Sequence, residues 1–224
     1  MADRKKILLL NPPGKKLYIR DYYCSKVSQA DYINHPIDLL IQSGILAQEF
    51  ELALVDAIIE KLSPEETLAR IKYIKPDGVL SLAGSVSWPE DIAFFNELKK
   101  TINVPIVVSG DIFRDEGEKI LNENSCIDAI ILNFTNSDAL NFFKDNAAQF
   151  ENIIYRKNGA VNLVQKKSET WEFSIPMPKH ELFAGRDYRY PFVRKGNFST
   201  ILSDFGCPFN CTFCIMAKLP FKWR

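Results

Sequence analysis

The alternation of short apolar runs with amphipathic stretches limits the folds open to residues 5–150 more than any other feature of the sequence. Five runs rich in Leu, Ile and Val lie at residues 6–10, 52–56, 78–82, 104–109 and 127–132. Runs that are apolar on both faces are typical of parallel strands covered by helices. The alternation therefore predicts a doubly wound α/β fold, with a five-stranded parallel sheet in the flavodoxin-like order 2-1-3-4-5.

The stretches between these runs carry helix signals. Residues 36–50 place apolar side chains such as Leu40 and Ile41 at helical spacing. In Ser63-Pro64-Glu65-Glu66, a serine suited to capping a helix precedes a proline and two acids suited to the first turn. This helix is predicted to stop near residue 74, before Pro76. Further helices are predicted at residues 89–100, 115–124 and 137–150.

The pattern changes after residue 150. Residues 153–164 have the pattern of two half-buried strands around Asn158-Gly159, a dipeptide typical of tight hairpins. A segment rich in aromatic residues follows and is predicted to be an ordered connector, and residues 198–202 are predicted to form a strand. The sequence therefore divides into an α/β domain at 1–150, a hairpin and connector at 151–197, and a last part at 198–224.

Charge and composition disfavour several classes of protein. The 224 residues include 28 basic and 28 acidic ones without a basic block, which gives nucleic-acid binding little electrostatic support. The apolar run near the amino-terminus ends at Pro12, too early for a signal peptide or a membrane span. Five cysteines, three of them crowded together, argue against a disulfide framework and predict a reducing, cytoplasmic location.

Three cysteines near the carboxyl end point to a metal centre. Cys207, Cys211 and Cys214 have the spacing C-x3-C-x2-C. Three thiolates on one tight loop can hold three irons of a cubane iron–sulfur cluster and leave a fourth iron open to a small molecule. A structural zinc site is the alternative. Zinc takes four ligands, however, and the other cysteines and histidines of the chain lack a paired spacing.

The run Gly206-Cys207-Pro208-Phe209-Asn210-Cys211-Thr212-Phe213-Cys214, preceded by a predicted strand, closely resembles the entrance to the radical S-adenosylmethionine enzymes. The resemblance implies that the three cysteines bind a 4Fe–4S cluster and that S-adenosylmethionine chelates the fourth iron, where it is cleaved reductively. Phe213 is implied to pack beside the adenine and the cluster. An electron donor such as flavodoxin or ferredoxin and a small-molecule substrate are the implied partners.

The first 150 residues resemble the cobalamin-binding domain found ahead of such barrels. Ile7-Leu8-Leu9-Leu10-Asn11-Pro12-Pro13 and His35-Pro36-Ile37-Asp38-Leu39-Leu40 follow the order of that family. An open sheet binds ligands beyond the carboxyl ends of its strands, and glycines there let a flat macrocycle approach the backbone. The candidate cofactor-binding residues at this edge are Asn11, Pro12, Gly84, Ser85, Ser109 and Gly110.

The same region departs from the cobalamin family in three places. It has no Asp-x-His-x-x-Gly motif, and His35 reads better as part of a helix entry than as a cobalt ligand. Gly110-Asp111 stands where the family has Gly-Gly, and residues 133–137 replace its acidic signature. Three alternatives stay open: cobalamin binding without histidine ligation, another ligand, or a vestigial domain.

The predicted function is that of the amino-terminal portion of a radical S-adenosylmethionine enzyme with a cobalamin-binding-like domain. Its chemistry would be radical C–H activation, with methyl transfer as one candidate reaction. The family barrel needs several more βα units after Cys214, so the chain alone is expected to be inactive and no catalytic residue is assigned. The alternative is a non-catalytic flavodoxin-like module that binds a ligand or partner, with a vestigial or zinc-filled cysteine loop.

Overall fold

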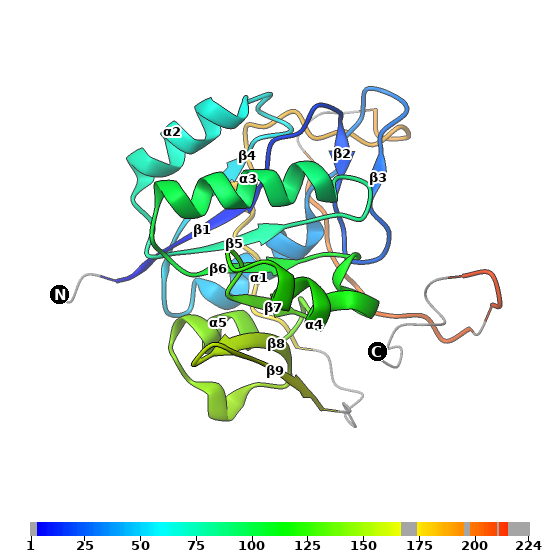
Figure 1. Ribbon diagram of the computed structural model, residues 1–224. Coiled ribbons are helices and arrows are strands. Elements are labelled where there is room, and N and C mark those ends of the chain that lie inside the picture. The colour runs from blue at the N-terminus through cyan, green and yellow to red at the C-terminus, as the bar shows by residue number, and fades with distance from the viewer. Residues whose placement is uncertain (1–3, 167–173, 195–197, 210, 215–224) are drawn as a thin grey trace.

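The computed structural model describes residues 4–166, 174–194, 198–209 and 211–214. Their centre is a seven-stranded sheet in the order β4-β1-β5-β6-β7-β8-β9, with helices on both faces (Figure 1). Its strands are β1 (Lys6–Asn11), β4 (Glu51–Asp56), β5 (Gly78–Leu82), β6 (Ile106–Ser109), β7 (Ala129–Ile131), β8 (Asn152–Lys157) and β9 (Ala160–Gln165). From β4 to β7 all neighbours are parallel and take the order 2-1-3-4-5, which confirms the predicted α/β class.

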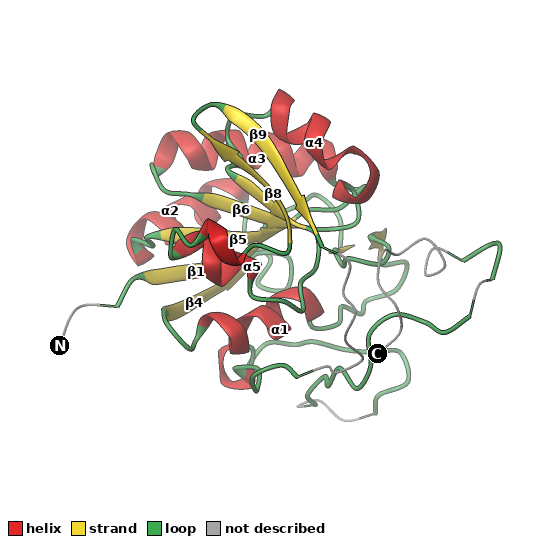
Figure 2. Ribbon diagram, turned by 90° about the horizontal axis from the view of Figure 1, so that it is seen from below, coloured by secondary structure: helices red, strands yellow, loops and turns green. Residues whose placement is uncertain are grey.

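Helices cover both faces of the sheet, as the doubly apolar strands require. The α-helices of the described residues are α1 (Ile37–Leu46), α2 (Pro64–Ile74), α3 (Trp88–Thr101), α4 (Phe113–Glu123) and α5 (Asp138–Phe143). Successive strand residues face opposite sides, so Leu9 packs in the core with α1 and α5, whereas Leu8 packs with α2, α3 and α4. Figure 2 shows α1 on the opposite side of the strands from α3 and α4.

Helix α2 begins and ends where the sequence predicts. Ser63 Oγ accepts a hydrogen bond from the backbone N–H of Glu66 at 3.1 Å, and Glu66 Oε2 accepts one from the N–H of Ser63 at 2.8 Å. This reciprocal capping box satisfies two backbone donors that a helix amino-terminus otherwise leaves unpaired.

The hairpin joins the five parallel strands, so the sheet has seven strands rather than the five predicted for the parallel sheet alone. β8 pairs antiparallel with β7, and β9 pairs with β8. Asn158 (φ 51°) and Gly159 (φ 79°) make the tight turn that their sequence indicates. Ile153 of β8 is fully buried in the core shared with α1 and α5. The edge of β7 offers a ladder partner and an apolar surface, and counting the parallel runs alone could not detect this pairing.

The last helix is shorter than the predicted stretch 137–150. α5 ends at Phe143, and Asp145 has a left-handed backbone (φ 56°) that a right-handed helix does not accommodate. A 3-10 turn, η1 (Ala147–Gln149), then leads to β8. The Asp138 carboxylate accepts hydrogen bonds from the backbone N–H groups of Glu151 and Asn152 at 2.8 and 2.7 Å, which ties the chain back to the start of α5.

A small antiparallel pair that the sequence analysis did not predict lies between β1 and α1. It consists of β2 (Tyr18–Ile19) and β3 (Lys26–Val27), which form a sheet of their own. We call residues 18–27 the strap, because their side chains contact the carboxyl ends of several parallel strands. Two-residue strands are too short to show a period of apolar residues, so this element left no clear signal in the sequence.

Residues 198–202, predicted to form a strand, form none, and that prediction is wrong. A strand needs a ladder partner, and these residues pair neither with the β8–β9 hairpin nor with any other strand that the structure describes. Side chains hold the segment instead. The Phe198 ring meets the His35 ring edge-on at 5.1 Å between centroids, and Thr200 Oγ1 lies 3.1 Å from His35 Nδ1.

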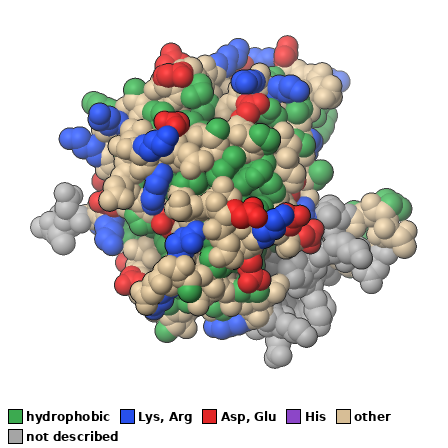
Figure 3. All heavy atoms as spheres, viewed as in Figure 1, with side chains coloured by type: hydrophobic (Ala, Val, Ile, Leu, Met, Phe, Trp, Pro, Cys, Tyr) green, Lys and Arg blue, Asp and Glu red, His purple; other side chains and the backbone are tan. Residues whose placement is uncertain are grey.

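The surface carries charges of both signs. Figure 3 shows Lys and Arg side chains interspersed with Asp and Glu on the face seen in Figure 1. In the part of the chain that the structure describes, no helix combines the length and apolar character needed to cross a membrane.

The position of Ile153 tests whether the hairpin is part of the main fold. Ile153→Ala should lower the free energy of unfolding by about 2–5 kcal/mol, because it leaves a cavity in a fully buried site. Leu163→Ala on β9 is the matched control, since Leu163 is 42% exposed and should cost much less. Urea unfolding followed by circular dichroism measures both. A hairpin that unfolds in a separate transition, with similar small costs for the two variants, would contradict the seven-stranded sheet.

Candidate functional site

The predicted cofactor-binding residues meet at the carboxyl edge of the parallel sheet. Asn11 ends β1 and Pro12 follows it, Gly84 and Ser85 follow β5, and Ser109 ends β6 with Gly110 directly after it. The loops after β5 and β6 touch, since the backbone N–H of Ala83 donates to Ser109 O at 2.8 Å. Their shared location agrees with the sequence analysis, whereas their role in binding stays a prediction.

A buried arginine from the strap fills the space between β1 and α3. The side chains of Arg20 and Asp91 are both 0% exposed and form an ion pair of 2.6 Å between Nη2 and Oδ1. Arg20 Nη1 donates to Asn11 Oδ1 and to Pro12 O, each at 2.9 Å. Arg20 Nε donates to Ser87 Oγ at 3.1 Å. Burial raises the pKa of the Asp91 carboxyl, and the Arg20 guanidinium opposes that shift.

A second group of contacts closes the edge above β5 and β6. Both the backbone N–H and the hydroxyl of Ser25 in the strap donate to Asp111 Oδ2, at 2.8 and 2.9 Å. The N–H of Ser85 donates to Asp111 Oδ1 at 2.9 Å. Asp111, which takes the place of a glycine in the family pattern, thereby ties the strap to two loops of the ligand edge.

The two glycines of the edge are already enclosed by the chain itself. A Cβ atom on Gly84 would lie 2.7 Å from Ser25 Cβ, and one on Gly110 would lie 1.8 Å from Ala83 O. Of the six predicted residues, Ser85 alone is exposed. The space beside these glycines, where a ligand was expected to approach, is therefore occupied by Ser25 of the strap and by Ala83 after β5. In this arrangement the edge does not fit a corrin ring or its nucleotide tail.

Below this edge, Asp38 in the first turn of α1 is an acid that the sequence analysis overlooked. Its Oδ2 accepts a hydrogen bond from Ser109 Oγ at 3.1 Å. Complete burial, reinforced by the nearby Asp21 carboxylate, raises the pKa of Asp38 from 3.8 to about 8, against the opposing effect of Ser109. Asp38 is therefore mainly protonated at neutral pH. An acid in the first turn of a helix usually lies at the surface and interacts favourably with the helix dipole. The sequence alone does not show whether such an acid is exposed or buried.

The connector is anchored to the same edge by a tyrosine. Tyr188 OH donates to Asp56 Oδ2 at 2.9 Å, and Asn11 Nδ2 donates to Asp56 Oδ1 at the same distance. Burial raises the pKa of Tyr188, and the Asp56 carboxylate adds to this effect. These bonds hold Tyr188, in the described stretch 174–194, against the sheet edge.

His35 belongs to the contact between α1, the connector and the segment before the cysteines. Its ring stacks on Tyr188 at 4.2 Å between centroids, and its Nδ1 pairs with Thr200. Burial lowers the pKa of His35 to about 4, with a further contribution from His180, so the imidazole is neutral near pH 7. These contacts are those of a packed core histidine.

The cysteine loop is irregular, and its thiols do not form a preassembled site. Cys207 and Cys214 are half-buried and Cys211 is exposed. Within the described residues, no three His, Cys, Asp or Glu side chains are grouped to hold a metal ion, so the expected convergence of the sulfurs is not observed. Metal sites commonly assemble only as the ion binds. Phe213 is 91% exposed, so the described residues supply no cover for the predicted adenine contact.

One residue anchors this loop to the α/β part. Phe205, two positions before Cys207, is fully buried. Its ring lies 5.3 Å from that of Phe134 and 6.1 Å from that of Tyr23 in the strap. The cysteine loop and the strap therefore share an aromatic contact, which the sequence could not show because these residues lie in three distant segments.

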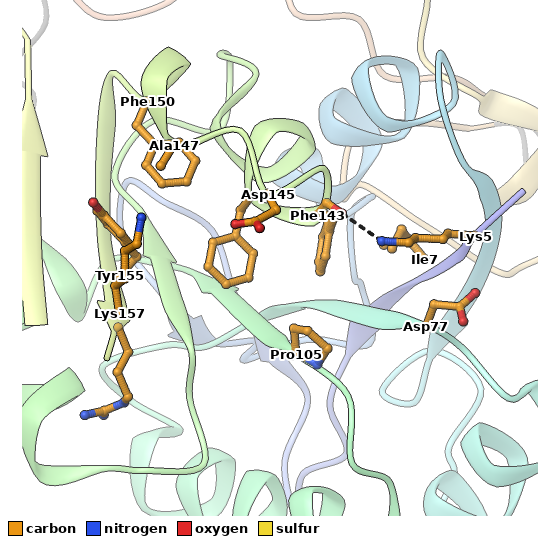
Figure 4. A pocket seen from close by; sticks show the side chains of 12 residues that line it. Lys5, Ile7, Asp77, Pro105, Phe143, Asp145, Ala147, Phe150, Tyr155 and Lys157 are labelled. Carbon is orange, nitrogen blue, oxygen red and sulfur yellow. Dashed lines mark hydrogen bonds between the residues drawn. The ribbon is translucent and has the colours of Figure 1, made fainter. Parts of the chain in front are cut away.

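A cavity of about 340 Å³ lies at the opposite edge of the sheet (Figure 4). Phe142, Phe143 and Phe150 form much of its wall. Lys5 Nζ reaches across to donate to Phe143 O at 3.4 Å. None of the predicted cofactor or metal residues lines it.

Comparison with known proteins agrees with the fold. No protein-family model matches the chain. A curated relative, "Uncharacterized methyltransferase PH0819" of Pyrococcus horikoshii, is 26% identical over 238 residues, covering 98% of this chain and 47% of the relative. Two solved structures of the cobalamin-dependent S-adenosylmethionine radical enzyme OxsB are similar at 12% identity. One, with aqua-cobalamin and S-adenosylmethionine bound, has a TM-score of 0.54 over 81% of this chain, and the other, with aqua-cobalamin, has 0.55 over 80%.

These likenesses have a limited reach. The chain spans about half of the curated relative and a quarter of the OxsB chain. At 12% identity the structural match shows the shared α/β fold.

The buried acid Asp38 predicts a pH dependence of stability. Its pKa is raised in the folded state, so between about pH 4 and pH 8 folding takes up a proton and stability falls as the pH rises. Between about pH 5 and pH 8, the free energy of unfolding should fall by on the order of 2–4 kcal/mol more in the wild type than in Asp38→Asn. Urea unfolding of both proteins at pH 5 and pH 8 measures this difference. The other buried acids contribute equally to both proteins, so their effects cancel when the two are compared.

Asp115→Asn is the control, because it makes the same Asp-to-Asn substitution at an exposed first-turn position of α4. Its pH dependence should match that of the wild type. An equal loss of stability in wild type and Asp38→Asn would show that Asp38 is not held protonated.

Proposed function

We propose that the chain corresponds to the amino-terminal part of a radical S-adenosylmethionine enzyme, with a cobalamin-binding-like α/β domain and a cluster loop at residues 207–214. The observation that carries this proposal is the spacing of Cys207, Cys211 and Cys214 in one irregular loop. The reaction class that the relatives favour is methyl transfer. A small-molecule substrate and a one-electron donor such as flavodoxin or ferredoxin belong to the proposal as partners.

The three cysteines would supply thiolate ligands to a 4Fe–4S cluster. When bound, such a cluster supplies the electron that cleaves S-adenosylmethionine. The described residues of the loop form neither helix nor strand, which suits this role because an irregular backbone lets three sulfurs turn toward one centre. Phe205 would hold the first cysteine at a constant distance from the α/β part, because its buried ring lies only two residues away.

The fold itself supports a binding domain rather than a catalytic one. The edge residues Asn11, Asp56 and Ser109 are engaged in hydrogen bonds within the chain. Catalysis is therefore proposed for the barrel that these enzymes possess. The chain alone is proposed to bind a cluster without turning over a substrate.

The alternative from another class is a non-catalytic module with a zinc-filled loop. Zinc needs a fourth ligand beside the three thiolates. Of the two histidines, His35 already contacts Tyr188 and Thr200 through its ring. His180 is therefore the histidine that could serve as the fourth zinc ligand. Metal content separates the two proposals.

Anaerobic reconstitution with iron and sulfide tests the proposal. Wild type should develop the broad absorption band of an iron–sulfur cluster, with a Mössbauer spectrum of a cubane that has one distinct iron. Replacement of Cys207, Cys211 or Cys214 by Ala should each abolish the band, because a cubane held by two thiolates lacks the ligands for stable binding. Iron and sulfide analysis gives an independent measure.

Cys24→Ala and Cys126→Ala are matched controls, one for an exposed thiol and one for a buried thiol. Both should keep the cluster. Tight zinc binding without a cubane would favour the non-catalytic module, and cluster assembly in a triple alanine variant of the loop would refute the ligand assignment.

A further inference from the structure

The edge strand β9 lacks the charges, prolines and bulges that usually protect the edge of a sheet. It is the last strand of the seven-stranded order (Figure 1), and no strand that the structure describes pairs with its far side. Its residues, Ala160–Gln165, include no charge and no proline, and they pair with β8 one to one. Natural edge strands normally carry such protection, because a bare edge pairs with other chains. At the other edge, β4 begins with Glu51 and ends with Asp56.

The hydrogen bonds of the hairpin show which backbone groups of β9 face outward. The N–H of Lys166, just after β9, donates to Glu151 O at 2.7 Å. In an antiparallel ladder, alternate residues bond to the partner strand, and the residues between them point their N–H and C=O groups the other way. The outward residues of β9 are Val161, Leu163 and Gln165. Their backbone groups have no hydrogen-bond partner among the described residues.

These outward groups are complementary to those of a second copy of the same strand. When two β9 strands lie antiparallel with Leu163 opposite Leu163, Val161 of each copy lies opposite Gln165 of the other. The outward residues then pair among themselves, so each outward N–H meets an outward C=O. A two-fold axis at Leu163 makes the contact the same on both copies, as in other isologous dimers. Because β9 carries no charge, this register sets no like charges opposite each other within the strand.

The side chain at the centre of this register favours the same pairing. Leu163 is 42% exposed and lies opposite Ile154 of β8, on the face of the hairpin that α4 covers. Directly opposite residues of an antiparallel pair have Cβ atoms about 5 Å apart. Two Leu163 side chains would therefore touch across the axis and remove apolar surface from water.

We propose that β9 is a self-association edge, where two copies of the chain join antiparallel with Leu163 on the two-fold axis and their sheets become continuous. The proposal does not depend on the cysteine loop or on a cofactor. A single pair of short strands makes a small interface, and small interfaces are typical of weak, transient complexes. The dimer is therefore expected to form and dissociate with protein concentration.

Sedimentation velocity over a range of protein concentration tests the proposal. Reducing buffer keeps the exposed thiols of Cys24 and Cys211 from linking copies. Wild type should pass from monomer to dimer as the concentration rises. Leu163→Lys and Leu163→Glu should each weaken the dimer at least about tenfold, because each places like charges directly opposite one another.

A mixture of the two variants tests the register itself. Equal amounts of Leu163→Lys and Leu163→Glu should form the dimer again, because opposite charges then face each other across the pair. This rescue requires residue 163 of one copy to lie beside residue 163 of the other. Tyr73→Lys is the matched control: Tyr73 is 87% exposed on α2, at the other end of the molecule from the hairpin, and the variant should associate like wild type. Circular dichroism verifies that the variants are folded.

Amide hydrogen exchange followed by NMR gives a second measurement. The outward amides of Val161, Leu163 and Gln165 should exchange more slowly at high protein concentration than at low. The inward amides of β9 already bond to β8, so their exchange should change much less.

Several outcomes would overturn the proposal. A monomer at every concentration, with the outward amides unchanged, would leave this edge to an extended segment of another protein or of this chain itself. A dimer that Leu163→Lys leaves intact would place the contact elsewhere on the surface. Failure of the two charged variants to associate on mixing would rule out the register centred on Leu163.

Discussion

The buried ion pair of Arg20 and Asp91 is the constraint around which the residues at the carboxyl edge of the parallel sheet are arranged. Two charges without solvent require complete hydrogen bonding, and the partners that provide it come from the loop after β1, the strap and the start of α3. Satisfying this pair sets the course of the chain between β1 and α1. It also decides that the ligand edge of the sheet is filled by the chain.

The strap connects the two regions to which sequence motifs assign chemistry. Its Arg20 lies among residues of the predicted cofactor edge, while its Tyr23 contacts Phe205 just before the cysteines. The connector makes a second link between these regions. Tyr188 donates a hydrogen bond to Asp56 at the edge and stacks on His35, and His35 in turn pairs with Thr200, ahead of the cysteines. The sheet edge and the segment before the cysteine loop are thus in contact through packed side chains.

Much of the fold follows from local pattern. The runs that became β1, β4, β5, β6 and β7 are apolar on both faces, and only a covered parallel sheet buries both. Ser63 and Glu66 mark the start of α2 by local hydrogen bonds, and Asn158-Gly159 marks the hairpin turn. The predicted strand at residues 198–202 failed because an extended segment becomes a strand only with a partner, and side-chain contacts to His35 hold it instead.

By itself the sequence determined the α/β class, the order of the parallel strands and the cysteine spacing, because each depends on residues close together in the chain. The tertiary structure decided that the hairpin extends the sheet, that Asp38 is buried beside Ser109, and that Arg20 pairs with Asp91. Partners separated by 71 residues leave no local pattern in a single sequence. Whether Gly84 and Gly110 face open space or other parts of the chain also depends on where Ser25 and Ala83 come to lie, which only the folded chain shows.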